Sequence, residues 1–209
     1  MQSQNNQSKS EYAKPQSQQV KALLIQKKRK KRKSKKESPV VEQWVAQPDG
    51  ATQYWKLSDP IAIDSNSLIK LSFLGGVPSN RYSRFLVSSS SYVGVGGDSS
   101  TFDTGGVNTG ETKVNNQVIQ KGVTQVPESG LNVLNFAIFG SATIETIGAA
   151  ASGSNKMSLP LLNFEVWQDG VMVNSIPLTN KAQGATQLAT VGNVNAFMPN
   201  YTDAVWRKP

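Results

Sequence analysis

Residues 161–176 read LLNFEVWQDGVMVNSI, and this stretch decides the fold class. Before residue 169 the side chains alternate between two faces, with Leu162, Phe164, Val166 and Gln168 on one face and Asn163, Glu165 and Trp167 on the other. A period of two residues is the signature of a β-strand. The dipeptide Asp169-Gly170 then separates residues 161–168 from residues 171–176, and Asp-Gly suits a type I′ turn. The stretch therefore predicts an antiparallel β-hairpin.

The same alternation recurs outward from the hairpin, and turn residues separate the segments at short intervals. The predicted strands are Thr52–Leu57, Ser67–Leu74, Arg84–Ser89, Ser91–Val95, Lys113–Gln120, Asn132–Phe139, Ala142–Ile147, Leu161–Gln168, Val171–Ile176 and Gln187–Val191. The Gly-rich residues 94–110 predict a long surface loop, and residues 148–153 predict a loop or a helical turn. Because no amphipathic helix follows residue 45, the crossover helices of a parallel sheet are missing. The sequence predicts an all-β fold, an antiparallel jelly roll or β-sandwich.

Cysteine and histidine are both absent. Their absence excludes disulfides and zinc sites built from thiolate or imidazole ligands, and it removes the usual general base of enzymes. We therefore expect no enzyme, no small-molecule substrate and no cofactor. No apolar run is long enough to span a bilayer, so we also expect no membrane partner.

Two pairs of acidic residues, Asp59 with Asp64 and Asp98 with Asp103, lie in predicted polar loops. A catalytic carboxylate dyad is disfavoured there, because acids in such loops are ordinarily solvated. Clustered Asp oxygens suit calcium better, and a structural calcium ion at a subunit junction would offset their mutual repulsion. Plain solvation of the four carboxylates is the alternative.

Charge is divided unequally along the 209 residues, although the formal net charge is only +8. Residues 1–36 contain twelve Lys and Arg and one acidic residue, Glu11, which gives +11. The remaining 173 residues contain ten basic and thirteen acidic side chains, which gives −3. Such asymmetry indicates a basic tail that meets a polyanion. We expect residues 1–39 to form a largely disordered arm and residues 40–209 to form the folded domain.

Residues 27–36 read KKRKKRKSKK, with nine positive charges in ten residues. Lysines outnumber arginines and no aromatic residue is interleaved, so the run favours neutralisation of a phosphate backbone without sequence readout. The predicted nucleic-acid-binding residues are Lys21, Lys27, Lys28, Arg29, Lys30, Lys31, Arg32, Lys33, Lys35 and Lys36. A nuclear localisation signal or a solubilising tail is the alternative interpretation, and import can coexist with polyanion binding.

A basic arm, a short linker and a single antiparallel β domain resemble the coat proteins of small icosahedral positive-strand RNA viruses, particularly those of plants. The resemblance lies in the architecture of the whole chain. It implies a jelly roll that assembles with many copies of itself into a closed shell, with KKRKKRKSKK (Lys27–Lys36) facing genomic RNA inside. It further implies a location in the virion and the host cytoplasm, and a C-terminal extension from about residue 200 in which Trp206 anchors onto a neighbouring copy. The alternative for Trp206 is packing on its own domain.

A second function class remains open. In it, the β-sandwich of a cellular or phage protein recognises a ligand, while the basic tail binds a polyanion or directs nuclear import. Assembly state separates the two classes, because a coat protein forms large particles and a binding module remains a monomer or a small oligomer.

Overall fold

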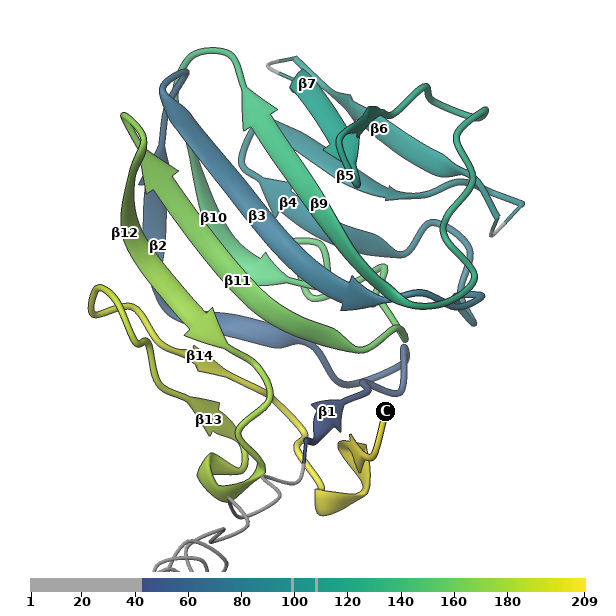
Figure 1. The fold of residues 1–209 in the computed structure, drawn as a ribbon, viewed down its shortest axis with the longest axis vertical. Coiled ribbons are helices and arrows are strands. Elements are labelled where there is room, and N and C mark those ends of the chain that lie inside the picture. The colour runs from purple at the N-terminus through teal and green to yellow at the C-terminus, as the bar shows by residue number, and fades with distance from the viewer. Residues whose placement is uncertain (1–42, 99, 108) are drawn as a thin grey trace, which may run out of the picture. The chain divides into compact units, whose positions relative to one another are not determined.

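The computed structural model describes residues 43–98, 100–107 and 109–209, which form two antiparallel β-sheets packed face to face (Figure 1). The first sheet runs in the order β15 (Trp206–Arg207), β1 (Val45–Ala46), β11 (Leu161–Gln168), β3 (Ser67–Leu74), β9 (Leu131–Ile138), β7 (Thr109–Val114) and β8 (Gln117–Val118), and β12 (Val171–Pro177) also pairs with β11. The second runs in the order β13 (Thr186–Gln187), β14 (Ala196–Phe197), β2 (Trp55–Ile63), β10 (Ala142–Ile147), β4 (Arg84–Ser88), β5 (Ser91–Val95) and β6 (Phe102–Gly106).

Helical structure in this part of the chain is limited to two 3-10 turns, Lys181–Gln183 and Asp203–Val205. No helix among the described residues is long and apolar enough to cross a membrane.

The predicted all-β antiparallel fold is confirmed. Four strands, β3, β5, β10 and β11, have the predicted bounds. The hairpin β11–β12 turns at Asp169 and Gly170, whose φ angles of 49° and 77° are those of a type I′ turn. From Phe164 to Trp167 the faces of β11 are those that the alternation predicts, with Phe164 and Val166 buried and Glu165 and Trp167 half-buried on the other face. At the start of the strand the register shifts, so Leu161 is buried and Leu162 only half-buried.

Strands that are far apart in the sequence lie side by side. The turns β2–β3 and β9–β10 each cross from one sheet to the other, and β2 then pairs with β10 while β3 pairs with β9. By contrast, β4, β5 and β6 follow one another as a meander in the second sheet (Figure 1). Long-range pairing of this kind is typical of wound antiparallel sandwiches.

Aromatic side chains from both sheets meet in the core. Phe85 of β4 contacts Phe73 of β3 and Phe102 of β6, with ring centroids 4.7 and 5.7 Å apart. The largest fully buried side chains are Trp55, Phe73, Phe85, Phe102, Phe136 and Phe164. This aromatic layer packs the two sheets against each other.

The prediction of a surface loop over residues 94–110 is wrong. Strand β6 and the start of β7 lie within it, and Phe102 is fully buried. Gly105 pairs with Tyr92 of β5, and a Cβ atom at Gly105 would lie 2.8 Å from the Tyr92 hydroxyl. The glycine is needed because the Tyr92 side chain lies across the neighbouring strand, so the Gly-rich composition reflects close packing inside a sheet.

Three other strands differ from their predicted bounds by more than one residue. Strand β2 continues through Pro60 to Ile63, because the register shifts at this point and a bulge accommodates the residue that cannot donate a hydrogen bond. The predicted strand Lys113–Gln120 is instead the hairpin β7–β8, which turns at Asn115 and Asn116 with φ angles of 49° and 66°. The predicted strand Gln187–Val191 is reduced to β13, Thr186–Gln187.

Candidate functional site

The predicted nucleic-acid-binding residues lie outside the described residues. They are Lys21, Lys27, Lys28, Arg29, Lys30, Lys31, Arg32, Lys33, Lys35 and Lys36. The arm prediction for residues 1–39, and its boundary with the domain, therefore stay predictions. The folded domain begins, within the described residues, with Gln43 and Trp44 leading into β1.

Most lysines and arginines of the domain face a carboxylate or an aromatic ring. Lys113 forms an ion pair with Glu111. Lys70 lies over Trp167, with its Nζ atom 4.4 Å from the ring centroid, and Lys181 lies 3.5 Å from that of Trp44. The Glu111 carboxylate offsets the charge of Lys113, whereas an aromatic ring holds its lysine in place without neutralising the charge.

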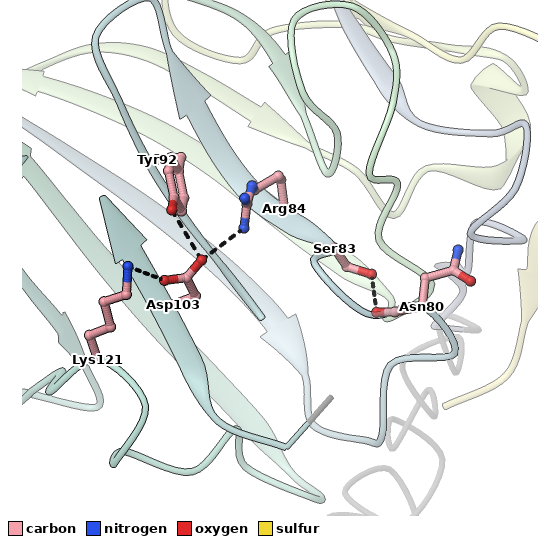
Figure 2. Close-up of polar contacts among 6 residues, drawn as sticks. All are labelled: Asn80, Ser83, Arg84, Tyr92, Asp103 and Lys121. Atoms are coloured by element: carbon pink, nitrogen blue, oxygen red, sulfur yellow. Dashed lines mark hydrogen bonds and ion pairs between the residues drawn. The ribbon is translucent and has the colours of Figure 1, made fainter. Parts of the chain in front are cut away.

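Asp103 is the centre of the largest charge cluster (Figure 2). Its Oδ2 atom accepts hydrogen bonds from Arg84 at 3.4 Å and from the Tyr92 hydroxyl at 3.1 Å, and Lys121 Nζ lies 2.9 Å from Oδ1. The guanidinium carbon of Arg84 also lies 3.8 Å from the centroid of the Tyr92 ring. The Asp103 carboxylate raises the pKa of Lys121 through a hydrogen bond and charge attraction. This cluster fixes β4, β5 and β6 to one another.

The four candidate calcium ligands form no single cluster within the described residues, and a calcium ion at a subunit junction stays a prediction. Asp103 already faces two cations, and Asp98 accepts hydrogen bonds from the backbone of Ser100 and Thr101, which lower its pKa to about 2. Asp59 lies in the bulge of β2, and Asp64 lies in the β2–β3 turn. Hydrogen bonds from the Ser67 hydroxyl and the Asn66 backbone lower the pKa of Asp64. Among the described residues no three acidic groups lie close enough together to hold a metal ion.

Within the single chain described, the Trp206 side chain packs on its own domain, and its anchoring onto a neighbouring copy stays a prediction. Its side chain is 6% exposed, and its Nε1 donates to the Tyr201 hydroxyl at 2.8 Å. That hydroxyl in turn donates to Asp203 at 2.6 Å; burial, followed by this hydrogen bond, raises the pKa of Tyr201. Strand β15 pairs with β1, so within a single chain the C-terminal segment completes the edge of the first sheet rather than extending away.

A groove runs along β9, on the outward face of the first sheet. Its floor consists of Val133, Asn135 and Ala137, three outward residues of that strand. Leu68 and Lys70 of β3 form one wall. The groove has a volume of about 740 Å³, within the range of small-ligand sites.

The opposite wall of the groove comes from the β7–β8 hairpin. It consists of Glu111, Lys113, Asn115 and Asn116. Asn115 Nδ2 donates to Asn132 Oδ1 at 2.8 Å, and Asn115 Oδ1 accepts from the Val133 backbone at 3.0 Å. These hydrogen bonds fasten the hairpin turn to β9, so this wall is preorganised.

The β3 wall is held by an outward row on β11. Glu165 accepts hydrogen bonds from Trp167 Nε1 at 2.8 Å and from Asn163 Nδ2 at 2.7 Å. The oriented Trp167 ring then receives Lys70, whose backbone is in register with Glu165 on one side and Asn135 on the other. The Lys70 side chain is thereby fixed as part of the wall.

Comparison with protein-family models, curated proteins and solved structures finds no match to this chain. The groove was not predicted from the sequence. Its residues come from β3, β7, β9 and the β7–β8 turn, and in the sequence each of them looks like an ordinary solvent-facing position.

Proposed function

We propose that this chain is a viral coat protein that assembles into an icosahedral shell and packages RNA through its Lys/Arg-rich arm. The observation that carries the proposal is the division of charge between +11 in residues 1–36 and −3 in the rest of the chain. A β domain near neutrality can pack against many copies of itself, whereas a strongly charged domain would repel itself. In this proposal the arm neutralises RNA phosphates without reading sequence.

The ion pairs of cationic side chains in the β domain support this division of roles between domain and arm. Asp103 and Glu111 offset the charges of Arg84, Lys121 and Lys113, and residues 37–209 carry no net positive charge, so the proposal assigns polyanion binding to the arm. The proposal includes no catalytic step and no cofactor. It places the protein in the virion and the host cytoplasm, with nuclear import through the basic run as a compatible second role.

Sedimentation and electron microscopy of the expressed protein test this proposal. We expect large particles from which nucleic acid can be extracted. We expect a chain lacking residues 1–36 to keep the circular dichroism of the β domain while losing the nucleic acid. A full chain that stays monomeric with and without RNA would contradict the coat-protein function.

The second candidate is a β-sandwich binding module whose basic tail binds a polyanion or directs import. The preorganised groove along β9 favours it, since a shell does not require such a site. A monomer or small oligomer that binds RNA through residues 1–36 would support this candidate over the coat protein.

A further inference from the structure

We propose that the groove along β9 binds a neutral oligosaccharide. This inference goes beyond RNA packaging and does not depend on it. The proposal rests on the shape, the charge balance and the free hydrogen-bonding groups of the groove, and each of these excludes a different class of ligand.

Polar groups without internal partners lie at the bottom and at one end of the groove. The Asn135 side chain is half-buried between Lys70 and Lys113 in the register of the sheet, and within the described residues it makes no hydrogen bond. The exposed side chain of Asn116 at the hairpin turn likewise makes none there. A carboxamide offers two donors and an acceptor, which match hydroxyl groups that both donate and accept. A half-buried amide gains most from a ligand that supplies both.

Apolar surface lies beside these amides. Val133 and Ala137 flank Asn135 along the floor, and Leu68 lines the wall. The C–H faces of a sugar ring can pack on such side chains while its hydroxyls reach the amides, an arrangement in line with the mixture of apolar lining and few polar groups found in ligand sites. The strands β3 and β7 flank β9, so the walls stand roughly 10 Å apart, wide enough for one extended chain.

The charge of the groove argues against a polyanion. Lys113 is paired with Glu111, Lys70 lies on Trp167, and Glu165 lies next to Lys70 in register. The two positive and two negative charges cancel. Phosphate binding draws its affinity from uncompensated cations that displace counterions, and this face has no such surplus.

The position of the groove argues against an extended peptide. A peptide that adds to a sheet pairs with the free backbone groups of an edge strand. Strand β9 is paired on both sides, with β3 and with β7, so its backbone groups are already used. Only side chains face the ligand, which favours a hydroxyl-rich molecule over a peptide backbone.

Saturation-transfer difference NMR on the full chain tests the proposal, because the method tolerates large particles. The probes are cellohexaose, xylohexaose, mannohexaose and chitohexaose, with hexauridylate as the anionic comparison. We expect at least one neutral hexasaccharide to show transfer. Asn135→Leu and Asn116→Gly should each weaken its binding about 10-fold, the loss of roughly one uncharged hydrogen bond. Asn116→Gly keeps the positive φ of the turn without strain.

A matched pair of Lys→Met variants, one on each sheet, controls for the loss of a lysine. Lys113→Met removes a groove residue, whereas Lys56→Met makes the same exchange on an exposed position of β2 in the opposite sheet. We expect Lys56→Met to leave saccharide binding unchanged. The proposal would be overturned if no neutral probe showed saturation transfer, or if both Asn variants bound the saccharide as well as the unchanged chain does. It would also be overturned if hexauridylate were the only probe to show transfer and Lys113→Met abolished that transfer.

Discussion

Replacing Phe85 by alanine tests whether the aromatic layer between the sheets holds the domain together. The Phe85 ring is fully buried and lies between Phe73 of the first sheet and Phe102 of the second. Phe→Ala exchanges in cores cost about 3–5 kcal/mol, through lost transfer free energy and the cavity left behind. We expect the upper half of that range, because two ring contacts between strands are lost together.

Urea unfolding followed by tryptophan fluorescence and circular dichroism measures this loss in the free energy of unfolding. Phe139→Ala is the matched control, because the Phe139 side chain is 65% exposed and its loss should cost under about 0.5 kcal/mol. The two variants should show the same difference in a chain lacking residues 1–36. A cost below about 1 kcal/mol for Phe85→Ala would refute the assignment of the sheet contact to this ring.

Two further predictions concern charged groups. Partial burial raises the pKa of Asp49, but hydrogen bonds from Thr52, Gln53 and Ala51 outweigh it and lower the pKa to about 2. The ionised Asp49 carboxylate therefore stabilises the folded state fully above pH 3.8, and this stabilisation is lost as the pH falls toward 2. After discounting for solvent exposure, the contribution of Asp49 to the free energy of unfolding is about 1 kcal/mol. Acid titrations of Asp49→Ala should lack this loss of stability between pH 3.8 and 2. A titration profile identical to that of the unchanged chain would contradict the prediction. Asp103→Asn should lower the free energy of unfolding by about 1–3 kcal/mol, because the Arg84 and Asp103 side chains are each only 13% exposed. The Lys121 side chain is 63% exposed, so Lys121→Met should lower the free energy of unfolding by under about 0.5 kcal/mol. Equal costs in urea titrations would show that the buried half of the cluster has no special role.

How much the sequence could predict depends on where the determining contacts lie. Strands β3 and β11 were predicted to the residue, because each carries its own alternation of buried and outward side chains. The hairpin at Asp169-Gly170 was predicted because its turn chemistry is local. The turn at Asn115 and Asn116 carries a comparable local signal, but the surrounding run of β-forming residues concealed it.

Features that depend on partners distant in the sequence escaped prediction. The Gly-rich sequence of β6 predicts a loop, because the packing of Tyr92 against Gly105 is not visible in the sequence. From the sequence, Asp103 was expected to be a solvated or calcium-binding acid. The fold places it beside Arg84, which lies 19 residues earlier, and beside Lys121. The groove likewise joins side chains from β3, β9 and the β7–β8 hairpin, whose proximity follows only from the order of strands in the sheet.

The salt dependence of RNA binding tests the central claim most directly. If the nine charges of residues 27–36 supply the affinity for single-stranded RNA, log K for the full chain should fall with log salt at a slope of about −6. A chain lacking residues 1–36, with its β domain intact, should show no measurable binding at physiological salt. Undiminished binding by that shortened chain, with a slope near that of the full chain, would place the RNA site on the β domain and contradict the division of charge on which the proposed function rests.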